Sequence, residues 1–223
     1  MAPFLPQLQI LPTPQRELWH ELVAIPPWFT LYGGTALALH LGHRESIDFN
    51  FFGTRLIDPD EVLALELLQG ATILEKAPQT LTVGVERGGW VKLSFFGVPH
   101  LPLLRPPLFA PDNQLRVASL LDIAGTKAAV VQKRAEAKDY IDIDALITHG
   151  IALPAILAAG QALYGHTFAP QSALKALCYF EEESLMSLPH ELKVRLIEAV
   201  HNTELDKIPV LSVLKTPDKG DED

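Results

Sequence analysis

The sequence predicts an α+β protein, in which a mixed α/β part comes first and an almost wholly helical part follows. Two changes of hydrophobic pattern lead to this prediction. Apolar and polar residues alternate between residues 71 and 98, as they do in half-buried strands. Beyond a proline-rich connector, residues 98–114, the apolar residues recur with the period of helices instead. With 223 residues, of which 48% are hydrophobic, the chain can bury one substantial core or two small ones.

Helices and a single strand are expected before residue 71. Gly33 and Gly34 form a tight turn with Thr35 near the N-cap of the helix that follows, and Asp58 caps a later helix. In order, the expected elements are a short helix at about 16–24 within a proline-rich opening, helix 35–41, strand 46–53 and helix 58–69.

The alternating region is expected to form three strands, over residues 71–77, 79–87 and 90–98. On the last of them Lys92 and Ser94 point to the same side, because successive strand residues face opposite ways. Asp48 and Asn50 share one side of strand 46–53 for the same reason. The polar sides of these two strands are expected to adjoin each other.

The helical part is expected to begin after residue 110 and to contain five helices. Gly150 ends one of them, and Pro154 and Pro189 begin two others. The helices are expected over about 115–134, 138–149, 154–163, 170–181 and 189–203. The domains predicted from this organisation are an α/β domain with an N-terminal extension over residues 1–110, a helical lobe over 111–205, and an acidic, flexible tail over 206–223.

The composition excludes several classes of protein. A formal charge of −9 argues against non-specific binding to DNA, which needs a basic surface. Residues 1–15 lack the basic start of a secretory signal, and no apolar run reaches the roughly 20 residues that span a bilayer. The only cysteine, Cys178, cannot form an internal disulfide and is expected to be a small buried hydrophobic residue. A cytoplasmic protein that does not bind membranes is therefore predicted.

The turn at Gly33, Gly34 and Thr35 has two interpretations. Two glycines allow a ligand close to the backbone, and the free amides at a helix N-terminus attract phosphate. Alternatively, the segment is a tight turn followed by an ordinary helix cap.

The polar segment before strand 46–53 also carries groups that suit a phosphate. Arg44 can clamp a phosphate through its planar guanidinium, Ser46 can donate a hydrogen bond, and Asp48 can hold a divalent cation. For His43 a structural hydrogen bond is predicted instead of metal ligation, because no second histidine lies at ligand spacing. The alternative is a polar loop that leads into a strand.

Carboxylates are scarce for a site that holds two metal ions, since such sites need several acids. Asp48 is the one secure acid, and Glu86 would add a second if its strand has the right register. Further along the chain, Lys127 either reaches across a cleft towards a phosphate or lies on a solvated helix face. Asp139 and Asp142, three residues apart on one helix face, are either site residues or partners of the helix dipole.

The segment "GGTALALHLGHRESIDFNFF", together with Lys127 and "RAEAKDYIDIDAL", resembles the AbiEii/AbiGii family of nucleotidyltransferase-like toxins of type IV toxin–antitoxin and abortive-infection systems. The resemblance spans roughly residues 30–148. It implies a polymerase-beta-like nucleotidyltransferase domain, a mixed sheet with flanking helices, followed by a helical lobe. It also implies Mg²⁺ or Mn²⁺ with a nucleoside triphosphate, an RNA or protein acceptor, and a small DNA-binding antitoxin as partner.

By the same resemblance, Gly33, Gly34 and Thr35 would line the nucleotide phosphates and Asp48 would be the first metal-binding acid. Lys127 would contact the triphosphate, and Asp139 would have a catalytic or supporting role. With the groups named above, the candidate site residues are as follows: catalytic, Asp48, Asn50, Lys127 and Asp139; nucleotide-binding, Gly33, Gly34, Thr35, Arg44, Ser46 and Lys127; metal-binding, Asp48 and Asn50.

Two positions depart from the family pattern, because Asn50 and Ser94 stand where acids are usual. An asparagine oxygen can ligate magnesium, but it brings no charge. Lys92 is either an ion-pair partner of Asp48 in place of a missing cation or an ordinary surface lysine on an exposed strand. Two functions therefore stay open: transfer of a nucleoside monophosphate from a triphosphate to RNA or protein, and a catalytically degenerate module that binds a nucleotide or a protein. An interaction scaffold without any ligand is a third possibility.

Overall fold

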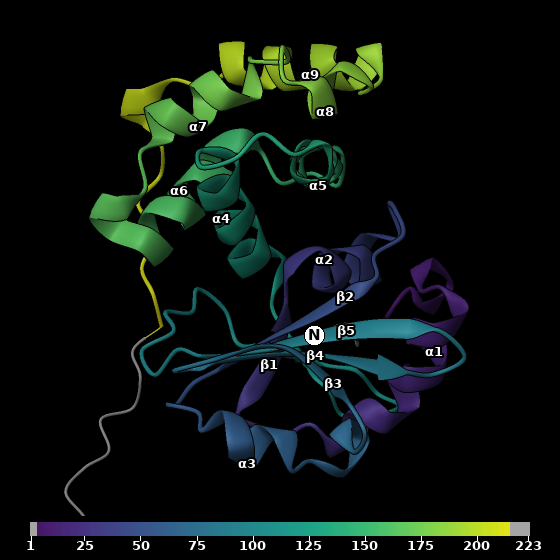
Figure 1. Ribbon diagram of the computed structural model, residues 1–223. Helices are drawn as coiled ribbons and strands as arrows, with labels where there is room; N and C mark the ends of the chain where they lie inside the picture. The colour runs from purple at the N-terminus through teal and green to yellow at the C-terminus, as the bar shows by residue number, and fades with distance from the viewer. Residues whose placement is uncertain (1–3, 215–223) are drawn as a thin grey trace, which may run out of the picture.

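A computed structural model describes residues 4–214 and has one mixed β-sheet with a helical lobe above it (Figure 1). The sheet has seven strands in the order β3-β4-β5-β2-β1-β7-β6. Helix α2 lies on the face towards the helical lobe, and α1 and α3 lie on the opposite side. The strands are β1 (Phe29–Tyr32), β2 (Asp48–Gly53), β3 (Thr72–Ala77), β4 (Thr80–Glu86), β5 (Trp90–Gly97), β6 (Leu108–Phe109) and β7 (Arg116–Val117).

The helices follow the same chain order. In the sheet domain they are α1 (Thr13–Trp19), α2 (Gly33–Leu41) and α3 (Pro59–Leu63), and in the lobe they are α4 (Leu120–Val131), α5 (Ala137–Thr148), α6 (Leu153–Tyr164), α7 (Pro170–Leu177), α8 (Glu183–Met186) and α9 (His190–His201). Short 3₁₀ helices lie at Leu8–Ile10, His20–Ala24, Glu66–Leu68, Gly165–Thr167 and Leu205–Lys207.

Alternation along β2 separates the core from the upper face of the sheet. Phe49 and Phe51 are fully buried, and Phe51 stacks on both Phe49 and Phe95, whereas Asp48 and Asn50 on the other side are only partly buried. β2 pairs in parallel with β5 and antiparallel with β1, so it is a central strand with its polar side towards the lobe. This register places Asp48 and Asn50 at the centre of the sheet, on the face towards the lobe.

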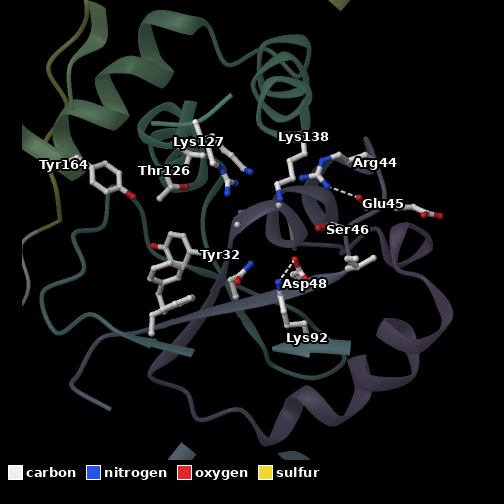
Figure 2. Close-up of a pocket in the computed structure, with 18 residues that line it drawn as sticks. Tyr32, Arg44, Glu45, Ser46, Asp48, Lys92, Thr126, Lys127, Lys138 and Tyr164 are labelled. Carbon is white, nitrogen blue, oxygen red and sulfur yellow. Dashed lines mark hydrogen bonds and ion pairs between the residues drawn. The ribbon is translucent and has the colours of Figure 1, made fainter. Parts of the chain in front are cut away.

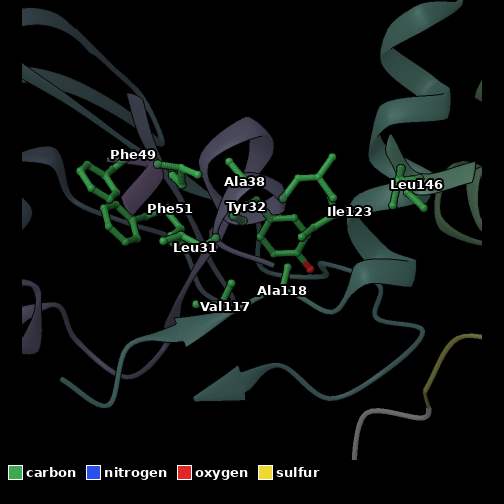
Figure 3. Close-up of a cluster of buried hydrophobic side chains, with 14 of the residues drawn as sticks. Leu31, Tyr32, Ala38, Phe49, Phe51, Val117, Ala118, Ile123 and Leu146 are labelled. Carbon is green, nitrogen blue, oxygen red and sulfur yellow. The ribbon is translucent and has the colours of Figure 1, made fainter. Parts of the chain in front are cut away.

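One continuous hydrophobic core joins the sheet to the lobe. Figure 3 shows Leu31, Phe49 and Phe51 of the sheet in the same cluster as Ile123 of α4 and Leu146 of α5. The lobe is therefore packed firmly against the sheet, because both bury side chains in a shared core.

The three predicted strands and the five predicted lobe helices are all present, with ends that shift by a few residues, and the short helix α8 is an addition that was not predicted. The main difference lies between residues 108 and 117, where β6 and β7 extend the sheet past the boundary expected at residue 111. Helix α4 consequently starts at Leu120 instead of 115, and Ser119 caps it by accepting a hydrogen bond from the amide of Asp122. Strand β1 was not predicted, since its four residues are all buried and show no alternation.

The structure changes two expectations, one about the burial of Cys178 and one about the tail predicted over residues 206–223. Cys178 is exposed, not buried, because it lies at the C-terminal cap of α7 where the helix turns to the surface. Part of the predicted tail is ordered against the body, since the amide of Leu214 donates to the carbonyl of Leu103 at 2.6 Å. The rest of that tail, residues 215–223, lies outside the described residues.

Among residues 4–214, no single helix is long and apolar enough to cross a membrane. Ala137–Thr148 and Leu153–Thr167 meet the length and composition criteria only when taken together across a bend of 118°.

Candidate functional site

A cavity of about 660 Å³ lies between the upper face of the sheet and the helical lobe (Figure 2). Its lower wall comes from the junction of β1 and α2, from the loop before β2, and from β2 and β5. Helix α4, the segment after it and the end of α6 form the upper wall. The predicted site residues that line it are Gly33, Gly34, Arg44, Ser46, Asp48, Asn50 and Lys127.

The floor of the cavity carries Asp48 and Asn50 of β2 beside Lys92 and Ser94 of β5. The strands are in register, with Asp48 opposite Lys92 and Asn50 opposite Ser94. Lys92 Nζ lies 3.2 Å from Asp48 Oδ2, which confirms the predicted ion pair. Ser94 is buried and accepts a hydrogen bond from Thr82 at 3.2 Å, so it is part of the packed sheet.

The glycine turn brings its backbone directly against this floor. Gly33 has a φ of +78°, and a Cβ at this position would lie 3.1 Å from Asn50 Nδ2. At Gly34 a Cβ would lie 2.5 Å from Arg44 Nη2. No side chain of the described residues caps the N-terminus of α2, so its first amides are free to bind an anion.

Thr35 lies behind the cavity wall and does not line it. Its side chain is fully buried and hydrogen-bonds to Ser46 Oγ at 2.8 Å and to the backbone oxygen of Asp48. Thr35 therefore holds the loop before β2 against α2. The phosphate contact implied by the resemblance stays a prediction for Gly33 and Gly34, and the geometry gives Thr35 a positioning role.

Asp142 of α5 binds cationic side chains from both walls, Arg44 from the loop before β2 and Lys127 from α4. Arg44 donates to both of its oxygens, at 2.7 and 2.9 Å, and His43 Nε2 donates at 2.7 Å. Lys127 Nζ lies 2.5 Å from Asp142 Oδ2. Burial by itself would raise the pKa of Asp142, but the hydrogen bonds from His43 and Arg44 and the charge of Lys127 hold that pKa far below its ordinary value.

The structural hydrogen bond predicted for His43 is thus confirmed, whereas Asp142 was not among the candidate site residues. Asp142 is fully buried and lies 98 residues along the chain from Arg44. Its position three residues after Asp139 left it open as a helix-dipole partner, and only the packing of α5 against the loop before β2 identifies its role.

Asp139 has a similar position one turn earlier on α5. It is fully buried and contacts Lys127 Nζ at 2.8 Å and Arg134 Nε at 2.9 Å. Because its carboxylate does not line the cavity, it orients two cations that do. This position suits a supporting role for Asp139, and the catalytic role that the resemblance implies stays a prediction.

Cationic side chains line the cavity although the chain as a whole carries a charge of −9. The wall contains five cations and two carboxylates: Arg44, Lys92, Lys127, Arg134 and Lys138, with Glu45 and Asp48. Each cation also pairs with a carboxylate on the wall or behind it: Lys92 with Asp48, Arg44 with Asp142, Lys127 with Asp139 and Asp142, and Arg134 and Lys138 with Glu136. Several clustered cationic donors of this kind suit a polyphosphate.

The side chains that line the cavity do not fit a pair of divalent cations. Within residues 4–214 no group of three or more His, Cys, Asp or Glu side chains can hold a metal ion. Asp48 and Asn50 offer one carboxylate and one amide oxygen to the cavity. Glu86 does not join them, because it is exposed at the far end of β4 opposite Trp90 and does not line the cavity.

Two solved structures share this fold. MenT4, a nucleotidyltransferase toxin from Mycobacterium tuberculosis H37Rv, superposes with a TM-score of 0.60 and 17% identity, over 86% of this chain and 83% of MenT4. An H. pylori protein described as a nucleotidyltransferase gives a TM-score of 0.51 and 17% identity, over 84% of this chain and 94% of that one. At 17% identity these two likenesses show that the chain has the fold of these nucleotidyltransferase structures.

The chain belongs to the AbiEii family, since the family profile described as "Nucleotidyl transferase AbiEii toxin, Type IV TA system" matches residues 18–211. A protein of Aquifex aeolicus (strain VF5), described as uncharacterised, is 33% identical over 135 residues. That match covers 58% of this chain and 63% of the relative, so it spans less than two thirds of the relative's length.

Proposed function

We propose that this protein transfers a nucleoside monophosphate from a nucleoside triphosphate to an RNA or protein acceptor. The supporting observation is that the glycine turn, Asp48, Arg44 and Lys127 all line one cavity, although they come from three separate parts of the chain. The family membership supports the same reaction class.

Each of these groups has a physical role in the proposed reaction. The amides of Gly33 and Gly34, with Arg44 and Lys127, bind the phosphates and offset their charge. Asp48 and the amide oxygen of Asn50 would hold one Mg²⁺ or Mn²⁺ ion, which supplies further neutralisation of phosphate charge when bound. An acceptor hydroxyl then releases its proton to solvent and its oxygen forms a bond to the α-phosphorus, while the bond from that phosphorus to the bridging oxygen breaks and pyrophosphate leaves.

Substitution of Gly33 by alanine is expected to weaken triphosphate binding about tenfold or more, because it disturbs the amides that contact a charged ligand. Gly70→Ala is the matched control, since Gly70 has a φ of +75° against +78° for Gly33 but meets nothing within 4 Å. Both variants should lose a similar stability, about 1–2 kcal/mol, from the left-handed backbone. Calorimetry with inorganic tripolyphosphate measures the difference, and equal affinities in the two variants would contradict the phosphate role.

A second function is favoured by one specific observation, the ion pair of Lys92 with Asp48 beside the neutral Asn50 and Ser94. A carboxylate that is already paired with an ammonium group, with no second acid nearby, is poorly equipped for metal-assisted transfer. The alternative is that the protein keeps the cavity as a nucleotide- or protein-binding module and has lost the chemistry.

Incubation with each labelled nucleoside triphosphate, Mg²⁺ or Mn²⁺, and cell extract tests the proposal. We expect label to enter acid-insoluble material, and treatment with ribonuclease or protease then identifies the acceptor as RNA or protein. Calorimetry with the same nucleotides separates the two functions. Binding without transfer would support the module and reject the enzyme.

The proposed reaction places the protein in the cytoplasm, where nucleoside triphosphates and both acceptor classes are found. Membership of a type IV toxin family also supports an antitoxin as a partner. Co-expression with the product of an adjacent gene, followed by a growth assay, tests that relationship.

A further inference from the structure

The end of the cavity away from Asp48 is lined by aromatic side chains instead of cations. Phe52 of β2 lies opposite Phe96 of β5, and their rings are 5.1 Å apart. Tyr32 packs edge-on against Phe52 at the same ring distance, and Tyr164 at the end of α6 completes this end. These four residues are called the aromatic shelf below. Figure 2 shows Tyr32 and Tyr164 on one side of the cavity and Arg44, Lys138 and the Asp48–Lys92 pair on the other.

Two polar groups of the aromatic shelf have no partner in the protein. The hydroxyls of Tyr32 and Tyr164 make no hydrogen bond to any residue within 4–214, although Tyr32 is only 3% exposed. Tyr164 is 36% exposed, and the Tyr32 hydroxyl is not among the fully buried polar atoms of the described residues that lack a partner. Both hydroxyls are therefore open to the cavity that they line, where a ligand can bond to them. Burial raises the pKa of both phenols, which keeps them protonated and able to donate.

The spacing along β2 matches a ligand with a charged end and an aromatic end. Asp48 and Phe52 point to the same side of the strand, four residues apart, which corresponds to about 13 Å. Gly33 directly follows Tyr32, so the phosphate end and the aromatic shelf meet at the start of α2. An extended nucleoside triphosphate has this length and this polarity.

We propose that the aromatic shelf binds the nucleobase of the nucleoside triphosphate and selects among bases. The half-buried rings of Phe52 and Phe96 stack on the face of the base, and the hydroxyls of Tyr32 and Tyr164 bond to its edge. This inference rests on the proposed function, because it assigns one end of the same cavity to the same ligand. It adds four residues that determine which nucleotide is used.

The two phenylalanines alone do not make this case, since paired aromatic residues on a strand are often only core. Phe49, Phe51 and Phe95 on the opposite face are such a core and are fully buried. Phe52 and Phe96 differ from them because both are partly exposed and line the cavity.

The test compares ligands that carry a nucleoside with a ligand that has the phosphates alone. The affinities of the four nucleoside triphosphates and of inorganic tripolyphosphate are measured by calorimetry for the wild type, for Phe52→Leu and for Phe96→Leu. Leucine keeps the apolar volume but has no ring, and Phe109→Leu on edge strand β6, where Phe109 is 54% exposed, is the matched control. Thermal unfolding checks that each variant is folded.

We expect Phe52→Leu and Phe96→Leu to bind nucleoside triphosphates roughly tenfold more weakly, as is typical when a stacking ring is lost, and to bind tripolyphosphate unchanged. Tyr32→Phe, which removes only the hydroxyl, should reduce the differences in affinity among the four nucleotides. Phe109→Leu should change neither.

Three results would overturn the inference, and they can be told apart. Equal weakening for both ligands would mean that the rings support the phosphate end. Unchanged nucleotide affinity would assign the aromatic shelf to another ligand, and a raised KM for the acceptor in the transfer assay would identify that ligand as the acceptor. If the wild type binds neither nucleotide nor tripolyphosphate, the proposed function fails together with the inference.

Discussion

Asp142→Ala should lower the free energy of unfolding by about 3 kcal/mol, a loss at the lower end of the range for breaking a buried ion pair. The carboxylate of Asp142 is fully buried and neutralises Arg44 and Lys127 while also accepting from His43. Its removal leaves positive charge in a low-dielectric site without compensation. Lys127 keeps Asp139 as a second partner, which limits the loss. Denaturant unfolding measures the change.

Asp144→Ala is the matched control on the same helix. Asp144 makes a bidentate pair with Arg195, at 2.8 and 2.6 Å, but the Arg195 side chain is 46% exposed and can be hydrated when its partner is lost. A loss of only about 1 kcal/mol is therefore expected. If both variants unfold at the same denaturant concentration, Asp142 does not stabilise the fold more than Asp144 does.

The same residue predicts a dependence of stability on pH. Because the folded-state pKa of Asp142 is depressed, its contribution is fully present above the ordinary aspartate pKa of 3.8 and is lost as the pH falls below that value. Acid titration of the wild type should show this loss, and Asp142→Ala should show correspondingly less. An identical acid dependence in the two proteins would contradict the assignment.

Asp48→Ala is expected to reduce nucleotidyl transfer by about three orders of magnitude or more, because the cavity loses its one floor carboxylate. Stability should change by less than about 0.5 kcal/mol, since exposed ion pairs contribute little. The side chains of Asp48 and Lys92 are 36% and 39% exposed. The transfer assay and denaturant unfolding, carried out on one preparation, separate the two effects.

Asp60→Ala is the control for this substitution. Asp60 on α3 makes a similar exposed pair with Lys76, at 2.5 Å, on the other side of the sheet. Asp60→Ala should leave nucleotidyl transfer unchanged.

Without divalent ions, Asp48→Ala should bind tripolyphosphate more tightly than the wild type, because a repelling carboxylate is gone and Lys92 is released. Retained transfer in Asp48→Ala would remove Asp48 from the reaction.

Much of the fold could be predicted from the sequence, because its elements depend on local patterns. Strands β3, β4 and β5 follow from alternation, and α5 and α6 follow from their apolar period and from Gly150 and Pro154 between them. The missed strands β1, β6 and β7 have two to four residues each and become strands only by pairing with neighbours. Their formation depends on contacts that no short window of sequence contains.

The features of the site also fall into two groups, those that nearby residues determine and those that tertiary packing determines. That Asp48 and Asn50 share a side of β2, and that two glycines precede a helix, was determined by the sequence alone, because strand pleat and helix capping act between residues close in the chain. Only the tertiary structure decided that Asp142 would hold Arg44 from 98 residues away. It also decided that Thr35 and Asp139 would lie behind the wall of the cavity, and that Phe52, Tyr32 and Tyr164 would line one cavity. Burial and charge pairing depend on which faces pack together, and that choice is made by the whole core at once.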